Sequence, residues 1–157
     1  MDEITKAYLA GCLDCDGYFT IKRSTYAMRV RGDAHNPIYS EKVGLKQVTP
    51  QVVDLLSEHF AGYRRIEKPS AQNGKPLHAW SVTDKQAIKC IAAVLPYLKI
   101  KRQQAELLLQ LRESKEITKH YRMVGSNVSP EESAKRESLF NQIKQLNDSR
   151  QTKPRLV

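Results

Sequence analysis

The feature that most constrains this chain is a short stretch in which an apolar helix with small residues runs into two aspartates, a glycine and a β-type segment. It reads Tyr8-Leu9-Ala10-Gly11-Cys12-Leu13-Asp14-Cys15-Asp16-Gly17-Tyr18-Phe19. The helix macrodipole disfavours negative charge at a C-terminus, whereas Gly17 suits the end of a helix. A carboxylate beside the unpaired carbonyls of a helix end is a suitable seat for a hard divalent cation. The alternative is an ordinary helix end with two solvated acids.

The charge of the chain points to a polyanionic partner. Its 157 residues suffice for one domain with a real core, and 26 Lys and Arg against 17 Asp and Glu give a net charge of +9. Such an excess is typical of nucleic-acid-binding proteins and less often of proteins on membrane surfaces. No apolar run approaches the roughly 18–20 residues of a membrane span, and the N-terminus lacks the layout of a signal or transit peptide. We therefore expect an intracellular protein without a membrane partner.

The three cysteines do not indicate a secreted disulfide scaffold. Cys12 and Cys15 have the spacing of a redox or zinc pair, but a second pair that would complete a tetrahedral site is missing from the sequence. On a helix they are expected to pack as small apolar side chains.

Hydrophobic periodicity predicts an α+β fold. The expected elements are a helix over 3–15, strands over 18–31 and 40–48, a helix capped by Thr49 with Pro50 first, strands over 63–68 and 77–83, a helix capped by Asp84 and ended by Pro96, and helices over 101–116 and from Ser129 onward. The order helix, hairpin, helix, hairpin, helix predicts a four-stranded antiparallel sheet with helices on one face.

The solvent face of this sheet is basic. Its outward positions are expected to be Thr20, Lys22, Ser24, Lys42 and Lys46, with Arg29 and Arg31 towards the first turn and Arg65 and Lys68 in or near the second hairpin. A twisted basic sheet face with hydrogen-bonding side chains suits a DNA groove. The alternative is a solvated strand face whose lysines oppose edge aggregation.

Three stretches carry a resemblance to a known family. Residues 9–17 resemble the signature of the LAGLIDADG homing endonucleases. Residues 95–105, and residues 146–149 with the basic residues after them, resemble the small, single-motif homodimeric group encoded in algal organellar introns. The resemblance covers nearly the whole chain. It implies the αββαββα core with a DNA-binding saddle in a single domain, divided into a core over about 1–116, a helical extension over about 117–149 and a basic tail over 150–157.

Because the chain has one motif, the resemblance implies a homodimer in which the motif helices of two copies pack together. The interface residues would be Tyr8, Gly11, Cys12 and Cys15. Gly11 and Cys15 leave a flat strip for close helix approach, and Ala10 is also small. Cys15 departs from the family pattern, which more often has Ala or Gly there, but Cys is small enough to be tolerated.

The resemblance also implies a catalytic site. Asp16 would be the metal ligand from each subunit, the backbone carbonyl of Cys15 the next ligand, and Asp14 a brace for the neighbouring helix end. Gln47 would position water, and Lys101 would lie near the scissile phosphate. From the residues alone, a strand-end Gln and a solvated Lys would be the preferred interpretation of these two. Mg²⁺ is the expected cofactor, with Mn²⁺ able to substitute and Ca²⁺ supporting binding without efficient cleavage.

The implied function is a site-specific endonuclease that makes a double-strand break in a long, nearly palindromic DNA target. The tail residues Arg150, Lys153 and Arg155 would grip phosphates rather than read bases. The alternative is a LAGLIDADG-derived nucleic-acid-binding protein without cleavage, such as an intron maturase or a regulator; a generic RNA-binding domain is the weaker alternative. The expected location is a chloroplast or mitochondrion if the gene is organellar, and otherwise the cytoplasm of a prokaryotic or phage host.

Overall fold

The computed structural model describes the chain except for residues 26–35, 70–73, 122–127 and 150–157. The expected DNA contacts Arg29, Arg31, Arg150, Lys153 and Arg155 lie outside the described residues. In chain order the elements are α1 (Glu3–Asp16), β1 (Gly17–Ser24), β2 (Ile38–Gln47), α3 (Gln51–Phe60), β3 (Tyr63–Glu67), β4 (Leu77–Thr83), α4 (Asp84–Val94), a 3-10 turn (Leu95–Tyr97), α5 (Arg102–Tyr121) and α6 (Pro130–Ser149).

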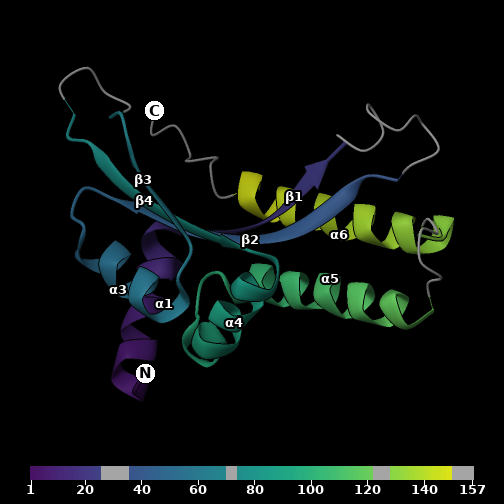
Figure 1. Ribbon diagram of the computed structural model, residues 1–157, viewed down its shortest axis with the longest axis horizontal. Helices are drawn as coiled ribbons and strands as arrows, with labels where there is room; N and C mark the ends of the chain where they lie inside the picture. The colour runs from purple at the N-terminus through teal and green to yellow at the C-terminus, as the bar shows by residue number, and fades with distance from the viewer. Residues whose placement is uncertain (26–35, 70–73, 122–127, 150–157) are drawn as a thin grey trace, which may run out of the picture.

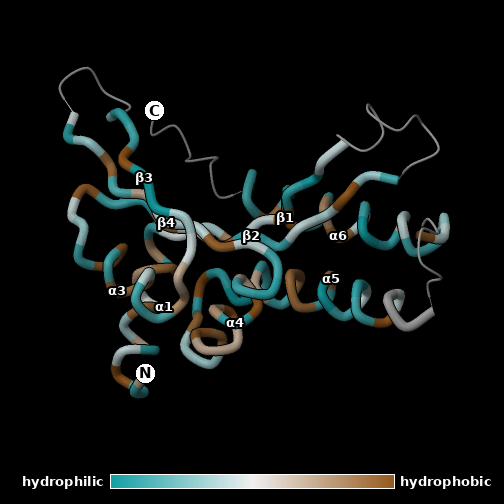
Figure 2. The backbone as a smooth tube through the Cα atoms, in the orientation of Figure 1, coloured by the Kyte–Doolittle hydropathy of each residue, from teal (hydrophilic) through white to brown (hydrophobic). Residues whose placement is uncertain are grey.

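The four strands form one antiparallel sheet in the order β1-β2-β4-β3. Figure 1 shows the sheet curving over α1, α3, α4 and α5, with the β1–β2 pair and the β3–β4 pair rising on opposite sides. Alternate strand residues such as Phe19, Val43 and Trp80 are buried in the core beneath the sheet, together with Leu9 and Leu13 of α1. Figure 2 shows hydrophobic and hydrophilic residues interspersed along the helices and strands. The expected α+β class and αββαββα order are therefore confirmed, with α5 and α6 added after the core.

The N-terminal caps of the helices differ in part from those that the sequence pattern predicts. Pro50, not Thr49, is the N-cap of α3, and no side chain caps it, so the predicted Thr49 cap is wrong. Asp84 is the first residue of α4 and not its cap, and its φ of 52° is a conformation that few L-residues adopt. At α6 the predicted cap is present, because the Glu132 N–H donates to Ser129 Oγ at 3.2 Å.

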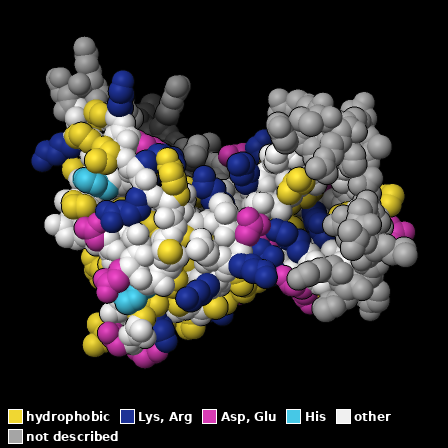
Figure 3. All heavy atoms as spheres, in the orientation of Figure 1, with side chains coloured by type: hydrophobic (Ala, Val, Ile, Leu, Met, Phe, Trp, Pro, Cys, Tyr) yellow, Lys and Arg dark blue, Asp and Glu magenta, His cyan; other side chains and the backbone are white. Residues whose placement is uncertain are grey.

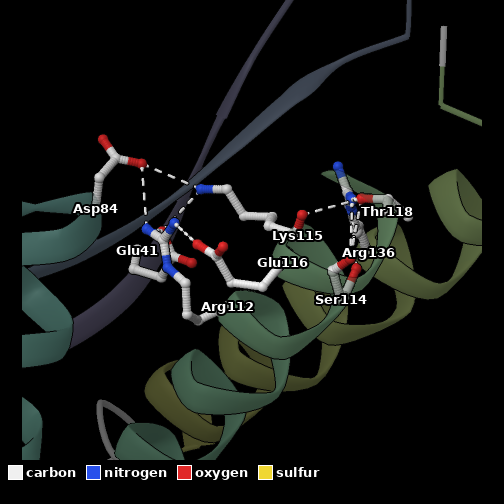
Figure 4. Close-up of polar contacts among 8 residues, drawn as sticks. All are labelled: Glu41, Asp84, Arg112, Ser114, Lys115, Glu116, Thr118 and Arg136. Carbon is white, nitrogen blue, oxygen red and sulfur yellow. Dashed lines mark hydrogen bonds and ion pairs between the residues drawn. The ribbon is translucent and has the colours of Figure 1, made fainter. Parts of the chain in front are cut away.

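Charged residues beneath the sheet join β2 to the later helices. Glu41 of β2 is fully buried, and its carboxylate accepts from Arg112 at 2.9 Å and Lys115 at 2.8 Å, both on α5. Asp84 of α4 also pairs with Lys115, and Arg136 of α6 donates to Ser114 of α5, as Figure 4 shows. These contacts fix α5 against the sheet and α6 against α5. Among the described helices, none has the length and apolarity needed to cross a membrane.

Candidate active site and nucleic-acid interface

Asp16 lies where α1 passes directly into the sheet. It is the last residue of α1, and Gly17 begins β1, which pairs with the end of β2 through Gly17 and Leu45. This pairing brings Gln47, the last residue of β2, to the exposed Asp16: Gln47 Nε2 donates to Asp16 Oδ2 at 2.8 Å. The structure thus places two of the predicted catalytic residues in direct contact, and the hydrogen bond fixes the orientation of the carboxylate.

Asp14 points away from Asp16 and into the protein. Its side chain is 7% exposed and accepts two backbone N–H groups, from Lys99 at 2.7 Å and from Lys101 at 2.9 Å. These groups lie just before α5, where the positive end of the helix dipole favours a carboxylate. The start of α5 therefore stabilises Asp14, whose charge is unfavourable at the end of α1. This contact joins the two helix ends, as expected for Asp14.

Lys101 provides the reciprocal contact. Its ammonium donates to the backbone carbonyls of Leu13 at 3.0 Å, Cys15 at 3.3 Å and Gly17 at 2.5 Å, and so places a cation at the negative end of α1. Lys101 is thus not a merely solvated lysine. An ammonium has three donors, so a contact with a scissile phosphate would compete with these carbonyls. The role of Lys101 near the phosphate stays a prediction.

The donors at this helix end are of the kind that a hard cation prefers. Each chain offers the carboxylate of Asp16 and the carbonyl of Cys15, both oxygen ligands. Within the part of the chain that the structure describes, His, Cys, Asp and Glu do not form a group of three or more that could hold a metal ion.

The predicted DNA-contacting residues of the strands lie on one face of the sheet. Cross-strand partners point to the same side, and the register pairs Lys22 with Ser40, Thr20 with Lys42, and Lys42 with Thr83. The expected residues on this outer face are Thr20, Lys22, Ser24, Lys42, Lys46 and Arg65, whereas Lys68 is exposed just after β3. Partial burial, helped by the nearby positive charges, lowers the pKa of Lys42. On the face of the molecule seen in Figure 3, Lys and Arg side chains are mixed with Asp and Glu among the described residues.

Two features of this face escaped the sequence reasoning. Tyr18 lies over Gly44 of the neighbouring strand, where a Cβ would come within 2.4 Å of the tyrosine ring. Glu67 lies on the outer face among the lysines and arginines. The first could have been found only from the strand register, which pairs Tyr18 with Gly44; the second required knowing which face of β3 is outward.

One face of α1 is open to solvent. Ile4 is 83% and Tyr8 54% exposed, Cys15 is exposed, Cys12 is partly buried, and a Cβ added to Gly11 would meet nothing within 4 Å. All four predicted interface residues are therefore at least partly exposed in the single chain, as residues that contact a second copy must be. Ala10 does not belong to this strip, because it is completely buried in the core.

Comparisons with known proteins identify the fold. No protein-family model matches the chain, and no curated protein matches it. Solved structures of homing endonucleases do match, and one of them is described as a LAGLIDADG homing endonuclease. The chain has the LAGLIDADG homing endonuclease fold that the motif at residues 9–17 indicated.

The individual matches differ in length. I-CvuI, in complex with its target in the presence of Ca, superposes with a TM-score of 0.67 and 22% identity, over 98% of this chain and 87% of that one. The group I intron-encoded I-CeuI, complexed with DNA, gives 0.66 and 15%, over 90% and 67%. The LAGLIDADG endonuclease I-GzeII, in complex with its DNA target, gives 0.55 and 13%, over 88% of this chain but only 43% of that one. The longer I-GzeII chain therefore has room for a second unit of this size.

Proposed function

We propose that this protein is a homodimeric homing endonuclease that makes a double-strand break in a long, nearly palindromic DNA target. The observation that carries the proposal is the position of Asp16. Its carboxylate is exposed at the end of α1, is oriented by Gln47 and lies where that helix joins a basic sheet face. The structural neighbours I-CvuI and I-CeuI, whose structures contain DNA, support the same function.

The proposed dimer brings two active-site carboxylates together. The exposed face of α1 ends at Asp16, so a two-fold axis along this face would place the Asp16 side chains of both copies near each other. A site formed in this way is incomplete in one chain and complete in two. It would also align the two outer sheet faces along one DNA duplex, which explains the expected palindromic symmetry of the target.

Mg²⁺ is the cation proposed for this site, held by Asp16 and the carbonyl of Cys15 from each chain. When bound, it would relieve the repulsion between the two carboxylates and polarise the scissile phosphates. The structures of I-CvuI were obtained with Ca or with Mg, and the one with Mg contains a DNA that is not cleaved. Mn²⁺ is proposed to substitute for Mg²⁺, whereas Ca²⁺ would support binding with little cleavage because its coordination is looser.

The protein side chains have separate tasks in the proposed reaction. Gln47 holds Asp16 in place and has a carbonyl oxygen that can accept a hydrogen bond from the attacking water. Lys101 supplies positive charge beside the reacting phosphate, where negative charge develops. Its backbone is held by Asp14, so the position of this charge is set by the same contact that joins α1 to α5.

The test is cleavage of selected DNA with a matched variant. Duplexes enriched from a randomised library in Ca²⁺ are incubated with Mg²⁺ and either the wild type or Asp16→Asn, and both strands are examined on denaturing gels. The wild type should cut both strands, and EDTA should abolish the cut. Asp16→Asn should bind with equal or higher affinity, because it removes the repulsion between two acids, but cleavage should fall to about the background rate.

Two outcomes would contradict the proposal. If Asp16→Asn cut at close to the wild-type rate, the proposed metal site would be wrong. If the wild type bound a selected sequence but cut neither strand with Mg²⁺ or Mn²⁺, the protein would instead be a binding protein of the maturase or regulator kind.

A further inference from the structure

One acidic side chain interrupts the basic outer face of the sheet. Glu67, the last residue of β3, accepts from Lys46 Nζ through Oε2 at 2.6 Å and from Arg65 Nε through Oε1 at 2.6 Å. The Arg65 guanidinium makes a second contact to the same oxygen through a terminal nitrogen. Each carboxylate oxygen therefore holds one cation.

The bridge between these residues crosses a strand. Lys46 belongs to β2 and Glu67 to β3, and β4 runs between them. The register places Ala79 of β4 directly between Lys46 and Arg65. Because its methyl side chain is short and buried, the long side chains on either side can meet above it. The contact thus depends on the three-strand geometry and not on neighbours in sequence.

Glu67 lowers the affinity for DNA of a surface whose only task is to neutralise phosphates. The two hydrogen bonds lower the pKa of Glu67, so it stays ionised at neutral pH and reduces the charge of the three-residue cluster from +2 to +1. A carboxylate near DNA repels the backbone, which lowers affinity for every sequence alike. Contacts between base edges and the three side chains can compensate for that repulsion.

We infer that Glu67 is a specificity-determining residue that directs Arg65 and Lys46 to the bases of G·C pairs in each half-site. Arginine and lysine donate to O6 and N7 of guanine, and a glutamate carboxylate accepts from the N4 amino group of cytosine. Arg65 keeps the donors of its other edge for guanine while Nε is held by Glu67. An A·T pair presents adenine N7 beside the N6 amino donor, so the two adjacent acceptors that Arg65 would bind on guanine are absent there. The inference rests on the proposed function, since it requires that this face reads DNA.

The experiment compares Glu67→Gln with Glu58→Gln. Both remove one negative charge, but Glu58 is an exposed acid on α3, which packs beneath the opposite face of the sheet. Each variant and the wild type select duplexes from a randomised library in Ca²⁺, and their affinity for one random duplex is measured over a series of salt concentrations. Unfolding midpoints of the three proteins confirm equal folding.

Glu67→Gln should bind random DNA more tightly, by about threefold or more at low salt, with a log–log salt slope up to about 0.9 steeper for one phosphate gained. It should also lose about tenfold in preference for G·C over A·T at one position of each half-site. Glu58→Gln should keep the wild-type preference and change affinity less than about twofold. An unchanged base preference in Glu67→Gln overturns the inference while leaving the endonuclease proposal intact. A wild type that enriches no sequence overturns the proposed function itself.

Discussion

At the scale of single residues, two aspartates two positions apart have opposite surroundings. Asp14 is buried and accepts backbone N–H groups at the entry to α5, whereas Asp16 is exposed and accepts a hydrogen bond from the Gln47 side chain. The helix end thus separates a residue that holds the fold from a residue available for chemistry. Lys101 belongs with Asp14 among the residues that hold the fold, because its backbone N–H donates to Asp14 and its ammonium donates to carbonyls at the end of α1.

The different surroundings of the two aspartates predict that Asp→Asn changes the free energy of unfolding much more at Asp14 than at Asp16. Asp14→Asn should lower the free energy of unfolding by about 2 kcal/mol or more, since a buried carboxylate that accepts two N–H groups is replaced by an amide that is neutral and has one acceptor oxygen. Asp16→Asn should change stability by less than about 0.5 kcal/mol, because the site is exposed. Urea unfolding of both variants checks this. Equal losses of stability would show that the carboxylate of Asp14 has no special structural role.

At the scale of elements, the buried charges join β2 to α5 across a long sequence separation. Glu41 occupies a core-facing position of β2 and depends on Arg112 and Lys115 for its stability. Removing one partner of a buried ion pair is strongly destabilising because the other charges stay behind. Glu41→Ala should therefore lower the free energy of unfolding by about 3 kcal/mol.

Glu116→Ala is the matched control for Glu41→Ala. Glu116 pairs with the same Arg112, at 3.4 Å, but its side chain is 45% exposed. Its removal should cost less than about 1 kcal/mol, as is usual for a surface pair within a helix. Chemical denaturation of the two variants gives the comparison. Similar losses in both would mean that burial does not decide the strength of this network.

The elements also show what the sequence could and could not predict. Periodicity and helix-stop residues predicted every helix and strand of the core, because burial of one face imposes a regular spacing on the chain. Thr49 was expected to cap α3, but a cap depends on backbone angles that composition does not determine. No local pattern marks Glu41 or Glu67, since their partners come from α5 and from another strand. Gln47 and Asp16 were assigned to one site through family resemblance and not through any local pattern, and their direct hydrogen bond is visible only in the structure.

At the scale of the whole molecule, the proposed site requires two copies. Light scattering should therefore report a mass near twice 17.9 kDa in the absence of DNA. The exposed face of α1 supplies the contact, with Gly11 at the point where two helices could approach most closely. A stable wild-type monomer would remove the basis for pairing the two Asp16 carboxylates.

Gly11 allows this dimer to be broken without disturbing the fold. A leucine there has open space in a single chain and suits a helix better than glycine, so Gly11→Leu should keep the helical circular dichroism signal and the stability of the isolated subunit. In the dimer the same side chain would force the helices apart. Gly11→Leu should therefore be monomeric and lose double-strand cleavage, whereas the smaller Gly11→Ala should remain dimeric and active. If the leucine variant kept the dimer mass, the two copies would meet through another surface, and the active site would have to form without the approach of the two α1 helices.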